Sequence, residues 1–306
     1  MSEPMLKKIK EKKGSTVIGA FFLVLSAFFF ALMSVFVRLS GDLPTFQKAF
    51  FRNAVAALIA LIMLAKSKDF SVKKGCRIPL LFRSLAGTVG IVCNFYAVDH
   101  MNLADASILN KLSPFFAVIF SVIILKEKAS KWDWALIALA FSGALFVVKP
   151  SFDFASVAPA LLGVLGGLGA GIAYAFVRLL GGRGERKPVI VFYFSLFSCL
   201  VVTPMFILQY TPMAWWQLLF LLLAGGCAGA AQFSITTAYA YAPAKEISVY
   251  DYFQVVFTAI LGWTCFGEIP DWLSFIGYAI IIAAAVLKYI KAKKSAKKEN
   301  NQNNNA

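Results

Sequence analysis

The sequence contains few charged residues for its length. Asp, Glu, Lys and Arg make up 15% of its 306 residues, whereas 60% are hydrophobic. Soluble globular domains contain about 25% charged and about 45–50% apolar residues. Because a soluble domain of this size could not bury so much apolar surface, the composition excludes an ordinary soluble protein and predicts a chain embedded in lipid.

Histidine and paired cysteines are also scarce. His100 is the only histidine and is placed in a loop beside Asp99, and the five cysteines stand singly, with no C-x-x-C pair. The H-E-x-x-H, G-x-S-x-G and P-loop motifs do not occur. These absences argue against a metal centre, a disulfide framework, the common hydrolases and direct use of ATP. No cofactor is predicted, and the chain is not expected to be an enzyme.

What the sequence does contain is a series of long apolar segments. A transmembrane helix needs roughly 20 mainly apolar residues to cross a hydrocarbon core of about 30 Å. The first run, Val17 to Val37, is too long for a signal-peptide core and is interpreted as the first span. The spans are predicted at 17–38, 46–65, 78–98, 104–125, 133–149, 157–178, 188–208, 215–241, 246–266 and 272–289.

The net charge of +15 is distributed unevenly along the chain. Basic residues concentrate in segments that all lie on one side of the membrane if there are ten crossings: 7–13, 66–77, 126–131, 183–187, 245 and 288–298. The opposite segments carry mainly acidic residues: Asp42, Asp99, Asp153, Glu268 and Asp271. The positive-inside rule then predicts a multi-pass protein of the cell membrane with both termini in the cytoplasm, and nucleic acid is not an expected partner. Residues 1–16 are predicted to form a basic tail and residues 290–306 a disordered tail.

An internal repeat with a period of about 141 residues divides the chain into halves at 17–149 and 157–289. Phe36-Val-Arg-Leu39 returns as Phe176-Val-Arg-Leu179, and Glu127 and Glu268 each follow an apolar run. Because each half contains five spans, the second copy must be inverted relative to the first. We therefore expect an all-α membrane protein of ten transmembrane helices in two inverted five-helix repeats, a plan that recurs among secondary transporters. Duplication kept for folding alone is the alternative.

Polar side chains form stripes on several of these apolar spans. In lipid they find no water, so the stripes are expected to converge on one another or on a wet cavity. Lys111 lies about 12 Å into span four from one side, and Asp251 about as far into span nine from the other, which places both near the midplane. The candidate substrate-binding residues are Lys111, Asp251, Asn94, Asn110, Ser107, Gln232, Tyr174, Tyr250, Arg83 and Arg52.

Each polar feature also has a purely structural interpretation. Lys111 and Asp251 can form a structural ion pair with each other, and Lys111 can extend toward the membrane surface. For Arg52 and Arg83, extension to the membrane surface (snorkelling) and a position in the cavity are equally good interpretations. For Arg38 and Arg178, snorkelling is the better one. Close helix packing is the favoured interpretation of the glycines of span six: Gly163, Gly167 and Gly171.

Short motifs in both halves make the chain resemble the EamA-like members of the drug/metabolite transporter superfamily. They are Arg83-Ser-Leu, Phe95-Tyr-Ala97, Leu103-Ala-Asp-Ala106, Ser113-Pro114, Lys126-Glu127, Ala242-Pro-Ala244, Tyr250-Asp-Tyr252 and Gly267-Glu268. The resemblance implies a central cavity lined by spans one to four and six to nine, with spans five and ten outside. Pro114 has no counterpart in span nine, so the proline break of span four is predicted to have no partner.

These observations favour a secondary transporter that moves a small polar or amphiphilic metabolite by alternating access. The resemblance leaves amino-acid-like, amine and nucleotide-like substrates open. The predicted partners are the substrate, the lipid bilayer and a coupling proton that Asp251 is placed to carry, in a monomer or a homodimer. The alternatives are a non-transporting membrane scaffold and a lipid-modifying membrane protein; the latter would need a converging acid, base or metal set that the sequence does not display.

Overall fold

A computed structural model describes residues 3–125, 130–148, 154–241 and 248–303, and all regular structure in these ranges is helical. The elements are α1 (Glu3–Leu39), α2 (Thr45–Ser67), α3 (Arg77–His100), α4 (Leu103–Asn110), α5 (Ser113–Leu125), α6 (Lys131–Val148), α7 (Phe154–Gly182), α8 (Lys187–Leu208), α9 (Trp215–Tyr241), the 3-10 helix η1 (Ser248–Tyr252), α11 (Phe253–Phe266) and α12 (Trp272–Asn303). In the described chain, eight segments are long and apolar enough to cross a membrane, one of them made of α4 and α5 together. With α6 and the η1–α11 segment they make up the ten predicted spans.

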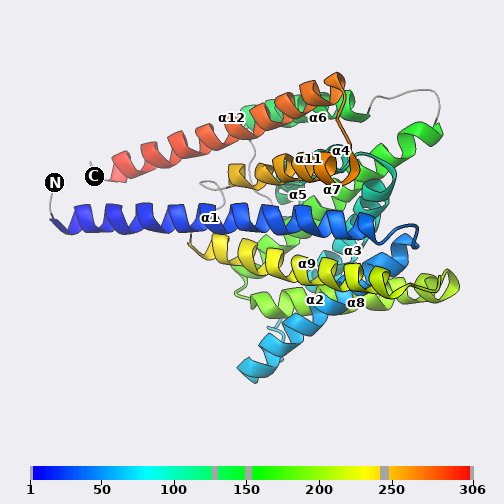
Figure 1. Ribbon diagram of the computed structural model, residues 1–306. Coiled ribbons are helices and arrows are strands. Elements are labelled where there is room, and N and C mark those ends of the chain that lie inside the picture. The colour runs from blue at the N-terminus through cyan, green and yellow to red at the C-terminus, as the bar shows by residue number, and fades with distance from the viewer. Residues whose placement is uncertain (1–2, 126–129, 149–153, 242–247, 304–306) are drawn as a thin grey trace.

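The packing of the helices reflects the two repeats. The most extensive contacts join α1 to α9, α3 to α7, α2 to α8 and α6 to α12. In the repeat, α1 corresponds to α7, α2 to α8, α3 to α9 and α6 to α12. Exchange of the two halves therefore converts the α1–α9 contact into the α7–α3 contact and leaves the α2–α8 and α6–α12 contacts unchanged. In Figure 1, α6 and α12 lie side by side along the upper edge, and α2 and α8 lie along the lower edge. This pattern is the one expected of two inverted five-helix repeats.

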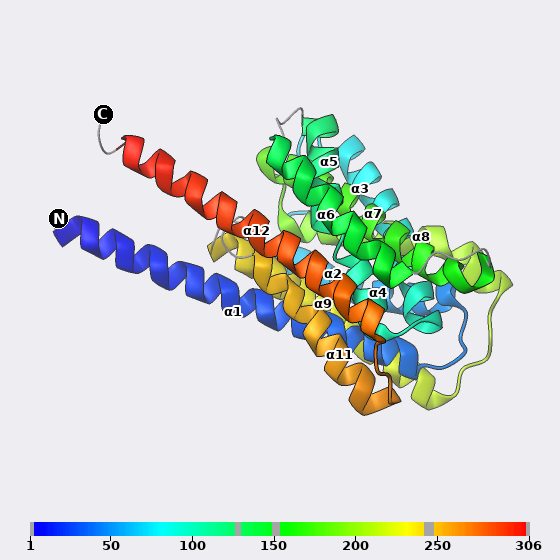
Figure 2. The same ribbon diagram turned by 90° about the horizontal axis from the view of Figure 1, so that it is seen from above.

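Two ends of the bundle can be distinguished. The start of α1 and the end of α12 project on the same side, as Figures 1 and 2 show. We call this side, with the loops 68–76 and 183–186, the basic end, and the side with the α1–α2 and α11–α12 turns the acidic end. The structure continues α12 to Asn303, through most of the segment for which the sequence predicts disorder. Its Lys, Ala and Glu residues are good helix formers, which explains the difference.

Spans four and nine are both interrupted near their middle. Span four changes from α4 to α5 at Lys111 and Leu112, just before Pro114, which has no N–H to bond to the preceding turn. Span nine changes from η1 to α11 at Tyr252 without any proline. The prediction that the break in span four has no partner is therefore wrong.

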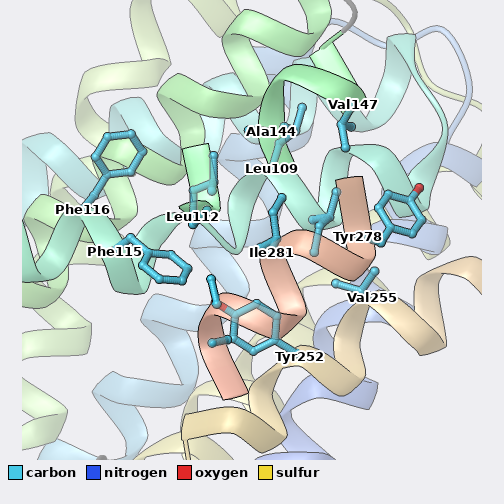
Figure 3. Close-up of a cluster of buried hydrophobic side chains, with 14 of the residues drawn as sticks. Leu109, Leu112, Phe115, Phe116, Ala144, Val147, Tyr252, Val255, Tyr278 and Ile281 are labelled. Carbon is cyan, nitrogen blue, oxygen red and sulfur yellow. The ribbon is translucent and has the colours of Figure 1, made fainter. Parts of the chain in front are cut away.

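The glycines of α7 allow span six to approach the break in span four. A Cβ on Gly167 would lie 2.8 Å from the carbonyl oxygen of Leu109, and one on Gly171 would lie 2.4 Å from Cβ of Phe116. The packing interpretation of these glycines is thus confirmed. On the other side, the break rests on an apolar cluster between α4–α5, α6, α11 and α12, and Figure 3 shows Leu112 and Phe115 gathered with Tyr252 and Ile281.

Candidate functional site

The two helix breaks bring Lys111 and Asp251 together. Nζ of Lys111 lies 2.6 Å from a carboxylate oxygen of Asp251, Oδ2, and only 5% of Lys111 is exposed. The backbone carbonyl of Lys111 accepts a hydrogen bond from the hydroxyl of Tyr252 at 3.1 Å. The two halves of the chain therefore meet at their corresponding helix breaks, through one ion pair and one hydrogen bond.

The ion pair leaves part of Asp251 without a partner. Its second carboxylate oxygen, Oδ1, is buried and makes no hydrogen bond within the described part of the chain. A buried carboxylate oxygen without a donor is costly, because it has lost its water and gained nothing in return. This atom is therefore a ready acceptor for an ammonium group, a hydroxyl or a proton.

Lys111 and Asp251 line a central cavity of about 760 Å³, part of which is open to its surroundings. Its walls come from α1, α2, α3, the α4–α5 break, α7, α8, α9 and the η1–α11 segment. Eight of the ten predicted site residues line it: Lys111, Asp251, Asn94, Asn110, Gln232, Tyr174, Arg83 and Arg52.

Two predicted site residues do not line this cavity. Ser107 is buried one turn before Lys111, and its carbonyl accepts the backbone N–H of Lys111 at 3.0 Å. Tyr250 packs instead against the small cluster of Leu23 and Ala238. Helical periodicity placed Ser107 on the polar face, but α4 ends at Asn110, so the regular spacing does not extend across the break.

Sequence reasoning missed several cavity residues. Gln254 lines the cavity although it is not among the candidate residues. In a 3-10 helix residues three apart eclipse one another, so η1 and the first turn of α11 bring Gln254 toward the face of Asp251. Phe30 and Met33 of α1 and Phe194 of α8 also line it, but an apolar residue in an apolar span gives no signal that distinguishes cavity from lipid.

Arg52 and Arg83 do not extend to the membrane surface. They are 3% and 7% exposed, respectively, and both line the cavity. The guanidinium of Arg83 stacks over the ring of Phe194, with Cζ 3.6 Å from the ring centroid. Of the two interpretations left open by the sequence, the structure favours the cavity position for both.

The acidic end is closed by ion pairs. Arg38 pairs with Glu268, and a second oxygen of Glu268 accepts the backbone N–H of Leu103 at 2.9 Å. Lys48 of α2 pairs with Asp99 of α3 at 2.7 Å. Snorkelling was the favoured interpretation of Arg38, and the structure replaces it by a contact that joins α1, the α3–α4 turn and the end of α11. The side chain of Arg178 lies outside the described residues.

A second, apolar cavity lies between α2, α8 and α9 toward the basic end. It has a volume of about 420 Å³ and is lined mainly by apolar residues such as Ile59, Met63 and Val191. Gln232 belongs to the lining of both cavities, and Lys187 lies at the far end of the second one, at the start of α8. The two cavities thus adjoin on the basic side of the Lys111–Asp251 pair.

These features define a polytopic membrane protein with a charged cavity at the interface of two inverted repeats. Comparison with protein families gives the particular family: the chain belongs to the EamA-like transporter family, which matches residues 17–149 and 158–290. A solved crystal structure of 17% identity, which covers 92% of this chain and 98% of its own, has a TM-score of 0.63, in agreement with the fold.

Curated relatives are transporters by name. The pseudopaline exporter CntI of Pseudomonas aeruginosa is 33% identical over 88% of this chain and 94% of its own length. Human solute carrier family 35 member G1 is 28% identical over 96% of this chain and 85% of its own length. A riboflavin transporter of Vibrio cholerae is 25% identical over 92% of this chain and 96% of its own length. The chain is therefore a multi-pass membrane transporter of small metabolites, and its family and relatives do not indicate an enzyme.

Proposed function

We propose that the protein is a secondary transporter that moves a small polar or amphiphilic metabolite across the plasma membrane by alternating access. The Lys111–Asp251 pair carries the proposal, because it joins the two repeats at two helix breaks inside a cavity. The substrate binds between the pair, and the two halves, 17–149 and 157–289, rock about it. The basic end then faces the cytoplasm, in line with the positive-inside rule.

Broken helices suit this role. In lipid, irregular backbone is tolerated only where protein or a water-filled cavity covers it. The interruption at Lys111 and Leu112 is covered by α7 on one side and by the apolar cluster of Figure 3 on another, and it meets the cavity at Asn110 and Lys111. Discontinuous helices at a repeat interface are a common way to expose backbone and charged groups to a substrate near the midplane.

The closure of the bundle supports a cytoplasm-facing state. The ion pairs of Arg38 with Glu268 and of Lys48 with Asp99 tie the acidic end together. The apolar cavity that adjoins Gln232 instead extends toward the basic end. A substrate would enter or leave along this side in the present state, and alternating access requires a second state in which the acidic end opens.

The alternative is a non-transporting scaffold, in which the Lys111–Asp251 pair only holds the repeats together. A scaffold needs the contact but not the charges, because a well-packed apolar pair of similar volume can replace a buried ion pair without loss of stability. A transporter needs the charges themselves. A scaffold would therefore stay folded after a double apolar substitution, and even the unmodified protein would show no uptake into proteoliposomes.

The test begins with a screen of amino acids, amines, nucleotides and riboflavin for compounds that raise the melting temperature of the purified protein. The stabilising compound is then used in proteoliposome uptake with Lys111→Met, Asp251→Leu and the double variant. Transport by all three is expected to fall about tenfold to 100-fold while the protein stays folded, because each variant lacks a charged group that would bind the substrate, and a hydrogen bond to a charged group contributes about 1.5–3 kcal/mol. Lys74→Met, on an exposed loop residue, serves as the matched control. Recovery of transport in the double variant would show that the pair is only structural.

A further inference from the structure

Two buried arginines in the central cavity have unused hydrogen-bond donors. Nη1 of Arg52 donates to Oδ1 of Asn53 at 2.6 Å, but its Nε has no partner within the described residues. Nε and Nη1 of Arg83 likewise have none there. Both side chains are more than nine-tenths buried. A buried N–H without an acceptor is unfavourable, and native structures keep such groups mainly where a ligand, an ion or water completes them.

The surrounding residues hold these donors in place. The face of the Arg83 guanidinium is covered by Phe194, which leaves the in-plane N–H groups for another partner. Gly87 makes room for this stack, because a Cβ there would lie 2.7 Å from the Phe194 ring and 2.9 Å from Nη1 of Arg83. On α2, the amide of Asn53 is fixed by hydrogen bonds to the carbonyl of Ala49 at 2.9 Å and to the hydroxyl of Ser198 at 2.8 Å. Both arginines therefore belong to a built site.

The charges in the cavity do not balance. Among the described residues that line it, three carry a positive charge, namely Arg52, Arg83 and Lys111, and one carries a negative charge, Asp251. Asp251 is already paired with Lys111 at 2.6 Å. Among the described residues, two positive charges of the cavity thus have no counter-ion, and a buried charge is tolerated only when a partner compensates it.

The three cations all come from the first repeat, and the carboxylate comes from the second. The repeat aligns Arg83 with Gly225, which has no side chain, and Lys111 with Tyr252. The cavity therefore lacks the two-fold symmetry of the fold. An asymmetric cavity of this kind is suited to a molecule that carries negative charge at one end and a hydrogen-bond donor or a positive charge at the other.

We propose that Arg52 and Arg83 form an anion subsite that binds a carboxylate or phosphate group of the transported molecule. Arginine presents its N–H donors in a planar fork that matches these groups. Oδ1 of Asp251, the unpartnered oxygen, accepts an amine or hydroxyl of the same molecule. The inference rests on the proposed transport function and narrows its substrate to a metabolite that carries a carboxylate or phosphate group.

The experiment measures the melting temperature of the purified protein at constant ionic strength against rising concentrations of anionic probes. The probes are succinate, glutamate, citrate and inorganic phosphate, with succinamide as the uncharged counterpart of succinate and sodium chloride as the simple-anion control. At least one carboxylate or phosphate probe is expected to raise the melting temperature more than the uncharged succinamide does. Its apparent affinity is expected to fall about tenfold or more in Arg52→Gln and Arg83→Gln, because each removes charge-assisted hydrogen bonds.

Two further variants make the result specific. Arg183→Gln changes an exposed arginine of the basic end and should bind the probe as the unmodified protein does. Arg83→Lys keeps the charge but not the planar fork, and should lose part of the affinity even if Arg83→Gln does not fold. Carboxylate probes that stabilise where phosphate does not, or the reverse, identify the group that the subsite takes.

The proposal is overturned if no anionic probe stabilises the protein more than succinamide does, if chloride stabilises it as much as the carboxylate and phosphate probes do, or if the Arg52 and Arg83 variants bind the probe as tightly as Arg183→Gln does. Failure of the transport function is a separate result. If the Lys111→Met, Asp251→Leu double variant transports normally while anion binding still depends on Arg52 and Arg83, the anion subsite is supported and the transport role of the ion pair is contradicted. If no anion binds but the ion-pair variants lose transport, only the anion subsite is contradicted.

Discussion

The hydroxyl of Tyr252 donates a hydrogen bond to the backbone carbonyl of Lys111, its counterpart 141 residues earlier in the chain. Each of the two residues lies at the break of its own span, so this bond fastens one interruption to the other. The same turn of backbone presents the Lys111 ammonium to Asp251. The position of the charged pair therefore depends on a neutral contact next to it.

Substitution of Tyr252 by Phe should weaken this junction. The variant keeps the ring in the apolar cluster of Figure 3 but removes the donor, and we expect a loss of about 0.5–1.5 kcal/mol of stability. Unfolding in detergent by heat or denaturant would measure it. Tyr250→Phe is the matched control, because the hydroxyl of Tyr250 makes no hydrogen bond among the described residues and its ring stacks on Phe253. Equal stability of the two variants would show that the Tyr252 bond contributes nothing.

A glycine of α7 that packs against the span-four break should tolerate alanine far less well than a glycine that faces open space. In Gly171→Ala the new methyl would meet Cβ of Phe116 at 2.4 Å and the carbonyl oxygen of Ser113 at 2.9 Å. Overpacking of this kind costs about 1–3 kcal/mol, so the melting temperature should fall. Gly226→Ala on α9, with no atom within 4 Å of its new methyl, should be neutral or stabilising by up to about 1 kcal/mol. Similar melting temperatures for both variants would contradict the close approach of α7 to the span-four break.

Orientation in the membrane can be tested by thiol labelling of intact cells. In a cysteine-free background, Asp42→Cys should react with an impermeant maleimide from outside, and Lys74→Cys only after permeabilisation. Both positions are exposed, at the acidic and the basic end respectively. Labelling of the Lys74 variant but not of the Asp42 variant in intact cells would reverse the orientation.

A natural cysteine of the basic end provides a separate test of burial by the same labelling. Cys76 belongs to the basic end but is fully buried in a cluster with Leu64 and Leu180. Burial raises the pKa of its thiol, so a smaller fraction is thiolate at pH 7 than for an exposed cysteine. A protein that retains Cys76 alone should therefore react slowly even in permeabilised membranes, and faster as the pH rises toward the raised pKa. Rapid alkylation at pH 7 would contradict this burial.

The sequence predicts the number and order of the spans, because long apolar runs and alternating basic loops are direct consequences of the bilayer. It also predicts that Lys111 and Asp251 share a site, since an ionisable residue far inside a span needs a partner. The break at Tyr252 could not be predicted, because no proline or glycine marks it. The position of the Arg83 side chain could not be predicted either. Whether a long cationic side chain reaches the membrane surface or stays in the cavity depends on Phe194, which lies on another helix.

The contact between Arg38 and Glu268 should act as a latch at the acidic end. Arg38 donates to Glu268 and to the carbonyl of Met101, and Glu268 also accepts the backbone N–H of Leu103 at 2.9 Å. One carboxylate thus holds the end of α1, the start of α4 and the segment after α11 together. Loss of the carboxylate leaves a half-buried guanidinium and a backbone donor without a partner, which penalises the closed state but not a state in which that end is hydrated.

Glu268→Ala is therefore expected to shift the protein toward a state open at the acidic end. A cysteine introduced by Asn94→Cys in the central cavity reports this shift through its rate of reaction with an impermeant thiol reagent added from the acidic side. The rate should rise about five- to tenfold, since a bias of about 1–1.4 kcal/mol between two states changes their ratio by that factor. Glu268→Gln, which keeps an oxygen for the N–H of Leu103, should give a smaller increase. Asp42→Ala, a change to an exposed acidic residue at the same end, should leave the rate unchanged. An unchanged rate in Glu268→Ala, with the protein folded, would mean that the pair does not control access.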